Sequence, residues 1–344
     1  MRAEARSEVA TGVVPSASSP ILTVAVPTCN GAAHLAEALG SILGQEGVAY
    51  ELIVSDDRSD DRTLEVVRAV AGDRARIEVN AERLGLAGNW NRCAAICRTP
   101  LIAIFHQDDV MEPGHLAAQA AALASEETIG LVAGAATVID ERGQPVPATV
   151  VDPGGLGPVD RVYEPGTLAE AMVAGNPLRC SAVMLRRAAF EAAGGFNPSY
   201  RYGVDWEFWL RLSRRWRVAW LARPSVRVRW HPASETHRFK AGTADLDETA
   251  RLMEILFAVD LKDRPDVDRL RRTARARLAR AFLNRAHEAL RAGRTALARD
   301  ALRRGVRLTP GLIATILSSP RLALAMATLA AAPRLAGRLF ARGK

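Results

Sequence analysis

A short apolar run that stops at an acidic segment constrains the fold more than any other feature of the chain. The run Leu101–Phe105 has five apolar residues without polar alternation, which is typical of a strand buried on both faces of a parallel sheet. It is followed directly by His106, Gln107, Asp108 and Asp109. In open α/β sheets, ligands bind beyond the carboxyl ends of the strands. Adjacent carboxylates are costly there unless a cation or donors compensate them, so the segment predicts a divalent cation that bridges the phosphates of a nucleotide.

The first hundred residues alternate between strand and helix patterns. Apolar spacing and breakers predict strands at 21–26, 50–54, 75–80 and 101–105, and helices at 34–43, 63–71 and 89–97. Gly85–Gly88 is predicted to be a flexible connection before the third helix. Such alternation predicts an α/β fold with a mostly parallel sheet.

The pattern changes along the second half of the chain. The predicted elements are a helix from Met111 to about 125, a strand and turn at 129–140, a long surface loop at 143–166, a strand at 178–185, a helix at 204–212, and strands at 218–221 and 226–230. Helical patterns rich in Ala, Leu and Arg follow from 246 to 308. The predicted organisation is a disordered lead-in at 1–19, an α/β domain at 20–240 and a basic α-helical region at 246–344.

The C-terminal region has two features of its own. Residues 276–308 resemble a helix pair of the tetratricopeptide type, and one such pair cannot bury its apolar face alone. The apolar stretch 312–332 contains Pro320 and Arg321, which favour two short helices over a membrane span.

Charge is distributed unevenly in this chain of 344 residues and net charge +8. Residues 261–344 hold 20 basic and 5 acidic residues, whereas the remainder holds 26 basic and 33 acidic residues. A basic region joined to a mildly acidic one indicates an anionic partner, either a membrane surface or nucleic acid. Because no recognised nucleic-acid-binding motif is present, the prediction is an anionic membrane surface and no nucleic acid.

Cysteine usage and the first residues indicate a cytoplasmic protein. The four cysteines, Cys29, Cys93, Cys97 and Cys180, have no zinc-binding spacing and are predicted to be reduced thiols. The first twenty residues lack the apolar core of a signal peptide.

Three acidic sites are candidates for chemistry. Asp56 and Asp57 follow the second predicted strand as Asp108 and Asp109 follow the fourth, so both pairs are expected at one edge of the sheet. Turn formation and helix capping are the alternative role for the first pair. Asp205 is predicted to begin a helix, where it is either an N-cap or a general base; aromatic neighbours would raise its pKa and the helix dipole would lower it.

Five segments together resemble one enzyme family. Residues 24–31, 54–63 and 105–109, with Gly194-Gly195-Phe196-Asn197 and residues 205–211, are similar in type and order to the family 2 inverting glycosyltransferases. The resemblance covers about residues 20–235. It implies a GT-A fold, a nucleotide-diphosphate sugar donor, most often a UDP-sugar, and Mn²⁺ or Mg²⁺.

The resemblance also implies roles for individual residues. Pro27 and Thr28, with Asn30 in the same loop, would contact the base. Asp57 would accept a hydrogen bond from the base, and Arg83 would lie near the nucleotide.

For the reaction centre, the resemblance implies that Asp108 lies against the ribose and donor sugar and that Asp109 ligates the metal, although the two can divide these roles differently. Asp205 would deprotonate the acceptor hydroxyl. Many relatives carry an acid where this chain has His106, which is either a ligand suited to Mn²⁺ more than Mg²⁺ or a packed side chain. His231 is a second histidine candidate near the metal, with a surface or core role as the alternative.

The predicted function is inverting sugar transfer to a hydroxyl of a glycan or lipid-linked acceptor, in cell-surface polysaccharide synthesis, in the cytoplasm or peripherally at the inner face of the plasma membrane. Two alternatives are a metal-dependent nucleotidyltransferase and a non-catalytic nucleotide-sugar-binding protein. A Gly-rich, Lys-bearing phosphate loop is absent from the sequence, and Asp205 would have no role in nucleotidyl transfer.

Overall fold

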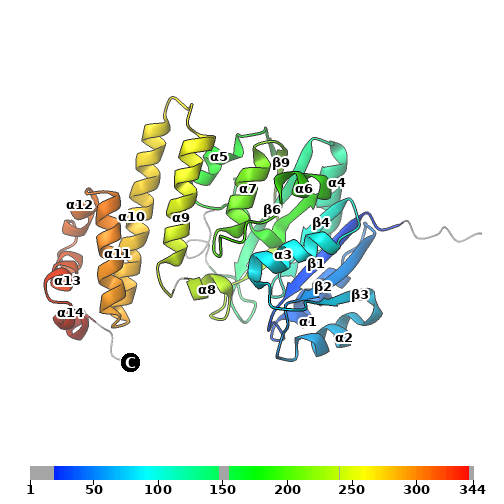
Figure 1. The fold of residues 1–344 in the computed structure, drawn as a ribbon, viewed down its shortest axis with the longest axis horizontal. Coiled ribbons are helices and arrows are strands. Elements are labelled where there is room, and N and C mark those ends of the chain that lie inside the picture. The colour runs from blue at the N-terminus through cyan, green and yellow to red at the C-terminus, as the bar shows by residue number, and fades with distance from the viewer. Residues whose placement is uncertain (1–18, 147–154, 240, 341–344) are drawn as a thin grey trace, which may run out of the picture.

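The computed structural model describes residues 19–146, 155–239 and 241–340. The lead-in predicted at 1–19 therefore lies almost entirely outside the described residues. A mixed, mostly parallel sheet occupies one end of the molecule and a stack of helices the other, as Figure 1 shows. The α/β prediction is confirmed.

The first half of the chain forms the parallel part of the sheet. Its elements are β1 (Leu22–Thr28), α1 (Leu35–Leu43), β2 (Tyr50–Asp56), α2 (Thr63–Ala71), β3 (Ala75–Val79), α3 (Gly85–Ile96) and β4 (Leu101–Ile104). These strands lie in the order β3-β2-β1-β4, and every neighbouring pair is parallel. Successive strands are added on one side of β1 up to β3, and β4 is then added on the other side of β1. In this register Thr28 lies opposite Asp56, so the loops after β1 and β2 leave the sheet side by side.

The second half extends the sheet beyond β4. Its elements are β5 (Val110–Met111), α4 (His115–Ser125), β6 (Ile129–Ile139), β7 (Arg161–Tyr163), α5 (Leu168–Ala171), η3 (Met172–Ala174), η4 (Cys180–Ala182), β8 (Val183–Arg186), α6 (Arg187–Ala193), α7 (Val204–Ser213) and β9 (Arg217–Arg229). Strand β8 is antiparallel to both β4 and β6, whereas β6 and β9 are parallel.

The C-terminal helices continue from the edge of the α/β part. They are α8 (Glu235–Phe239), α9 (Ala244–Ile255), η5 (Leu256–Asp260), α10 (Val267–Arg291), α11 (Thr295–Leu308), α12 (Leu312–Leu317), α13 (Pro320–Ala331) and α14 (Pro333–Phe340). Helices α10 and α11 pack on each other, on α9 and on α12–α14, which covers the face that a single helix pair would leave open. No helix among the described residues is long and apolar enough to cross a membrane.

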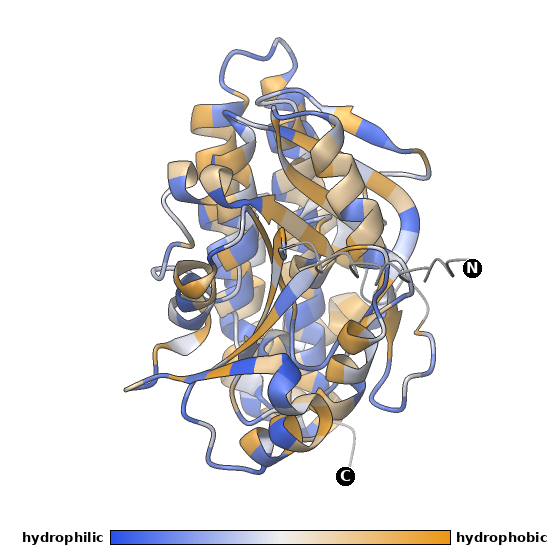
Figure 2. Cartoon of the chain, turned by 90° about the vertical axis from the view of Figure 1, so that its right-hand side faces the viewer, coloured by the Kyte–Doolittle hydropathy of each residue, from blue (hydrophilic) through white to orange (hydrophobic). Residues whose placement is uncertain are grey.

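Two buried apolar clusters hold the sheet. One lies on the side of α1, α2 and α4 and includes Leu39 and Phe105. The other lies on the side of α3 and α7 and extends without interruption into the C-terminal helices. Figure 2 shows the strands coloured mainly as apolar between helices that carry both polar and apolar stripes, as this two-sided burial requires.

Several predicted boundaries are wrong. Gly85–Gly88 is the first turn of α3 and not a connection. Met111 belongs to β5, and the next helix begins only at His115. Within the predicted loop 143–166, Arg161–Tyr163 forms β7 because it pairs with β9. The strand predicted from 178 begins at Val183, after a 3₁₀ turn.

One predicted pair of strands is a single strand. The segments 218–221 and 226–229 both belong to β9, whose pairing with β6 shifts register around Gly134 and Ala135, and Trp230 lies just beyond it. Such irregularity bends a strand without ending it.

Candidate active site

The loops after β1, β2 and β4 are tied to one another. The side chain of Gln107 accepts a hydrogen bond from the Cys29 N–H at 2.9 Å and donates one to the Cys29 carbonyl at 3.2 Å. Asn30, in a left-handed conformation with φ 51°, accepts from the Asp60 N–H at 2.9 Å. A Cβ on Gly31 would lie 2.1 Å from the Gln107 Oε1, so any larger residue there would displace the Gln107 side chain from its contacts with Cys29. These contacts fix the floor of the site.

Asp56 is a structural residue at the end of β2. Its carboxylate is fully buried and accepts hydrogen bonds from the Thr28 Oγ1 at 2.8 Å and from the Ser59 N–H and Oγ at 2.9 and 2.6 Å. The first acidic pair thus supplies one residue to the turn chemistry that was its alternative reading.

Asp57 caps a helix that lies far from it in sequence. Its oxygens accept hydrogen bonds from the Leu84 N–H at 2.7 Å, the Gly85 N–H at 2.9 Å and the Asn80 Nδ2 at 2.9 Å. This caps the N–H groups at the start of α3, and it explains why the helix begins at Gly85.

A hollow of about 480 Å³ opens beside this pair. Its lining includes Arg58, Asp60, Val79 and Arg83. Arg83 donates to the Arg58 carbonyl at 3.0 Å and pairs with the Asp60 carboxylate. Arg83 therefore lines this hollow, and its place near a nucleotide stays a prediction.

The remaining residues predicted to touch the base have different settings. Pro27 and Thr28 are buried within β1, and Asn30 is exposed in the following loop.

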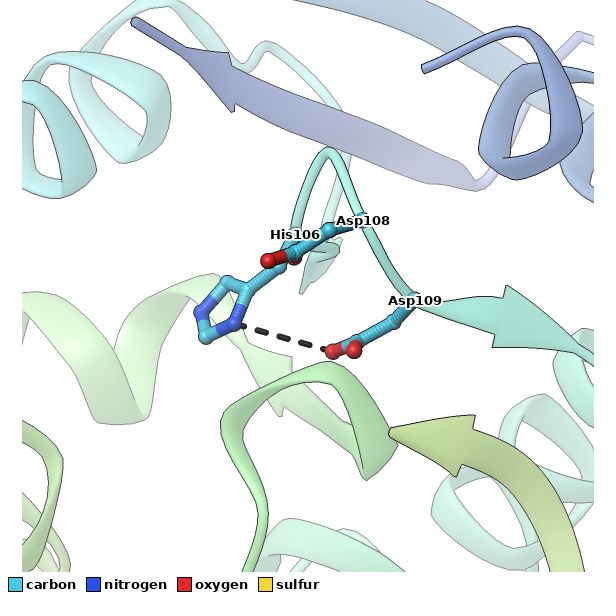
Figure 3. Close-up of side chains that lie close together, drawn as sticks. All are labelled: His106, Asp108 and Asp109. Carbon is cyan, nitrogen blue, oxygen red and sulfur yellow. Dashed lines mark ion pairs between the residues drawn. The ribbon is translucent and has the colours of Figure 1, made fainter. Parts of the chain in front are cut away.

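His106, Asp108 and Asp109 converge on one point after β4. One ligand atom from each side chain lies within 4.8 Å of the others, and Figure 3 shows the three side chains pointing into a common space. The His106 Nδ1 lies 3.7 Å from the Asp109 Oδ2, while the ring stacks on Trp90 with centroids 5.1 Å apart. Both alternatives for His106, packed side chain and potential ligand, are thus met by the same ring.

Asp109 is the inner carboxylate of the pair. Its side chain is 3% exposed, and its oxygens accept hydrogen bonds from the Ser181 Oγ at 2.5 Å and the Arg229 N–H at 2.8 Å. Burial, and then the charge of Asp108, raises the pKa of Asp109 to about 8. A cation bound beside Asp109 would therefore lower its pKa and favour its ionised form.

Asp108 is the outer carboxylate. Its side chain is 21% exposed, and its Oδ2 lies 2.9 Å from the His231 Nε2. Burial raises the pKa of Asp108, but the hydrogen bond from His231 and the nearby imidazoles outweigh it, so the pKa lies below its ordinary value. His231 is therefore part of the cluster.

Arg229 and Ser181 support the cluster, and sequence reasoning missed both. The buried Arg229 side chain donates to the Asp108 carbonyl at 3.0 Å and to the Glu37 carboxylate at 2.5 Å. Ser181 donates to Asp109 and accepts from the His106 N–H at 3.1 Å. No local motif marks either residue, because each reaches the site from a distant segment.

Asp205 lies in the first turn of α7, two residues after the N-cap Gly203, so it is not the N-cap. Its Oδ1 accepts from the Trp206 N–H and its Oδ2 from the Asn176 Nδ2, both at 2.8 Å. Burial raises its pKa to about 6, and these hydrogen bonds and the charge of Arg179 act in the opposite direction. Burial is the stronger effect in the competition left open by the sequence.

A short segment connects Asp205 with the acidic cluster. Asn176 contacts Asp205 at one end of segment 176–181, and Ser181 contacts Asp109 at the other. Between them, burial raises the pKa of the Cys180 thiol, and the charges of Asp205 and Asp109 raise it further. Both carboxylates therefore face the same six residues.

The donor set fits a divalent cation. Two carboxylates and an imidazole form a mixed oxygen and nitrogen site, in which the Nδ1 of His106 faces Asp109. Oxygen-rich sites with one imidazole suit Mn²⁺ better than Mg²⁺.

Comparison with known proteins identifies the family. A family described as Glycosyl transferase family 2 matches residues 23–192. Over 200 residues, the chain is 30% identical to EpsE of Bacillus subtilis, which carries the name of a glycosyltransferase; the match covers 57% of this chain and 67% of EpsE. The chain belongs to glycosyl transferase family 2. It is a glycosyltransferase, and the three leading motifs, at 24–31, 54–63 and 105–109, lie inside the matched range.

Solved structures support the fold of this family 2 glycosyltransferase. S. aureus TarS 1-349 in complex with UDP-GlcNAc aligns with a TM-score of 0.60 at 16% identity, covering 92% of this chain and 90% of the TarS 1-349 chain. The mannosyltransferase PcManGT from Pyrobaculum calidifontis, in complex with GDP-Man and Mn²⁺, aligns with a TM-score of 0.54 at 20% identity, covering 93% and 86%. The predicted GT-A fold is confirmed.

Proposed function

We propose that this glycosyltransferase moves a sugar from a nucleotide-diphosphate donor, with inversion, to a hydroxyl of a glycan or lipid-linked acceptor. The observation that carries the proposal is the approach of two kinds of carboxylate to segment 176–181: Asp109 of the acidic cluster, and the isolated Asp205. A cation-binding acidic cluster suits a diphosphate, and a separate carboxylate suits an acceptor hydroxyl.

The donor is a nucleotide sugar, and UDP-sugars are the first candidates. TarS binds UDP-GlcNAc and PcManGT binds GDP-Man in structures of the same fold. The hollow beside Arg83 would take the base and ribose. Thr28 and Asn30 hydrogen-bond to its lining residues Asp56 and Asp60, and Asp57 follows Asp56 in the chain. Because three internal donors already engage Asp57, its share in base recognition is limited to a remaining lone pair.

His106, Asp108 and Asp109 would hold Mn²⁺ or Mg²⁺, which supplies neutralisation of the charge on the leaving diphosphate. Of the two carboxylates, we assign to Asp108 the contact with what binds in the crevice. Asp108 is the more exposed carboxylate, whereas both oxygens of Asp109 are engaged by Ser181 and Arg229. His231 holds Asp108 in place and is the nearest further nitrogen donor.

Asp205 would act as the general base. With a pKa of about 6 it is ionised at neutral pH, yet it binds a proton more readily than an exposed aspartate does. The Asn176 and Trp206 donors fix the orientation of the Asp205 carboxylate. One base and no protein nucleophile suffice for single displacement, which inverts the anomeric centre.

The acceptor side of the proposal places the enzyme in the cytoplasm, peripherally at the inner face of the plasma membrane, where precursors of cell-surface polysaccharides are glycosylated. Its support is the charge asymmetry, because the basic C-terminal helices favour an anionic surface.

A donor panel tests the enzymatic proposal. The full chain is incubated with Mn²⁺ and UDP-, GDP- or dTDP-sugars, and release of the nucleoside diphosphate is followed by chromatography. We expect turnover with one nucleotide class and loss of turnover with EDTA. A nucleotidyltransferase would instead release pyrophosphate from a nucleoside triphosphate and a sugar phosphate, and a non-catalytic protein would bind a nucleotide sugar without turnover. Either result would overturn the proposal.

A further inference from the structure

Exposed apolar side chains are concentrated at the end of the molecule farthest from the sheet. Among the described residues, eleven large apolar side chains are exposed, and five of them lie between 313 and 340. These five are 47–66% exposed: Ile313, Leu317, Leu324, Leu335 and Leu339. A concentration of this kind in a short segment marks a surface that meets something apolar.

The exposed positions form continuous helix faces. Ile313 and Leu317 are four residues apart on α12, as Leu335 and Leu339 are on α14. On α14 the exposed leucines alternate with Arg334 and Arg338, while the intervening Ala336 is buried. Each helix therefore packs one side on the protein and presents a leucine side outward. We call the exposed side chains of α12, α13 and α14 the α12–α14 surface.

The charge of this surface has a single sign. Residues 309–344 contain five basic residues and no acidic residue. Within the described part of the chain, Arg321, Arg334 and Arg338 form no ion pair, whereas Arg304 on the neighbouring α11 pairs with Asp247 and Asp300. The cations of the α12–α14 surface thus remain available to an anionic partner.

A groove lies at the edge of the surface, between α10 and α13. It has a volume of about 710 Å³ and combines apolar side chains such as Leu322 and Phe340 with His287, Arg291 and Arg321. An apolar floor beside basic side chains matches a lipid that carries a phosphate.

We infer that the α12–α14 surface docks on an anionic phospholipid bilayer. The exposed leucines enter the interfacial region of the bilayer, and the arginines contact lipid phosphates. The groove receives the phosphate of one phospholipid and the first part of an acyl chain of the same lipid. This inference deepens the membrane association proposed above and rests on that part of it alone. Figure 1 shows α12, α13 and α14 along the outer side of α11, on the side away from the sheet, so a flat surface can reach them.

Two other occupants fit the surface less well. A second copy of the chain would bring unpaired arginines against each other across a two-fold interface, which costs energy. Nucleic acid would neutralise the arginines but would leave the five exposed apolar side chains without a partner.

Vesicle co-sedimentation of the full chain tests the inference. We expect binding to vesicles of phosphatidylcholine mixed with phosphatidylglycerol, weak binding to pure phosphatidylcholine, and weakening by salt. A variant with Leu324→Ser, Leu335→Ser and Leu339→Ser should bind about tenfold less or weaker, since each leucine loses its insertion energy. Arg321→Gln, Arg334→Gln and Arg338→Gln together should remove the preference for phosphatidylglycerol.

Matched controls keep the test independent of folding and of the enzymatic proposal. Val159→Ser with Val259→Ser removes exposed apolar side chains elsewhere, and Arg62→Gln removes an exposed cation on the far side; both should bind vesicles normally. Nucleotide binding, measured without vesicles, should be unchanged in all variants. Normal vesicle binding by the leucine variant would overturn the inference. So would a dimer that these substitutions convert to a monomer, or binding to DNA that the same substitutions weaken to the same degree.

Discussion

Two Asp-Asp pairs lie at the ends of β2 and β4, the strands on either side of β1, yet the fold uses the two pairs differently. Asp56 and Asp57 turn inward, and every carboxylate oxygen of this pair accepts a hydrogen bond from the protein. Of the second pair, Asp109 is likewise satisfied internally, but Asp108 faces outward beside His231. An Asp-Asp sequence at a strand end therefore does not by itself identify a ligand site.

The difference follows from strand order. Strand β2 lies between β1 and β3, and Thr28 at the end of β1 and Asn80 directly after β3 supply donors to its acids. Strand β4 lies at the place where the order of the parallel strands reverses, which is where open sheets leave a crevice. Neighbouring loops cover the first pair, and the crevice exposes part of the second.

The largest expected effect breaks the comparison at the outer carboxylate. Asp108→Asn should lower the transfer rate by about 10³-fold or more, because several kcal/mol of charge stabilisation depend on this site. Steady-state transfer over a range of Mn²⁺ concentrations measures it. Asp73→Asn, at an exposed acid far from the crevice, should behave like the unmodified enzyme. Full activity of the Asp108 variant would remove Asp108 from the reaction.

The next largest effect is expected at Asp205, the carboxylate outside both pairs. Asp205→Asn should reduce transfer by about 10²–10⁴-fold, the range expected for loss of a general base. Nucleotide affinity, measured by calorimetry, should be retained because Asp205 lies on the acceptor side. Transfer at the normal rate in this variant would show that another group removes the acceptor proton.

A stability measurement sharpens the contrast between the pairs. Asp57→Asn should lower the free energy of unfolding by about 1–3 kcal/mol, since at least one N–H group at the start of α3 loses its hydrogen bond to the buried Asp57 carboxylate. Asp108→Asn should leave stability nearly unchanged, because this carboxylate caps no helix. Urea denaturation of both variants provides the comparison. Equal losses would mean that the two pairs serve the fold alike.

The smallest effect concerns pH. Because Asp205 must be ionised to accept a proton, the transfer rate should rise with pH, be half-maximal at a midpoint near its pKa of about 6, and level off at higher pH. The hydrogen bond from Asn176 favours the ionised form, so Asn176→Ala should move that midpoint upward. Asn284→Ala, in the distant groove, should not move it. A midpoint that stays fixed in the Asn176 variant would show that Asn176 does not act through the base.

The sequence predicted the order and type of most elements because apolar periodicity is a local signal. The β1–β4 pattern and the α2 boundaries at Thr63 and Ala71 are examples. The start of α3 at Gly85 could not be predicted in this way, since its cap comes from Asp57, 28 residues earlier. β7 was missed because only its pairing with β9 makes it a strand.

The candidate site divides along the same line. His106, Asp108 and Asp109 share one segment, so a motif could bring them together on paper, and the structure brings them together in space. Ser181 and Arg229 reach them from other strands and turns, and the roles of all these residues in binding and catalysis stay predictions until the variants above are made.

Glu248 gives the C-terminal helices a part in where Asp205 stands. From α9, its carboxylate accepts hydrogen bonds from the N–H groups of Arg201, Tyr202 and Gly203 at 2.8–3.1 Å, directly before α7. A Cβ on Gly203 would lie 2.5 Å from the Leu252 Cδ1 of the same helix. The range 23–192 that matches the family is thus not a transplantable module. Recombination that joined residues 23–192 to a foreign C-terminal half would keep His106, Asp108 and Asp109 but would remove their partners Arg229 and His231. It would also remove Asp205 and the Glu248 carboxylate, so the two halves would have to be inherited together.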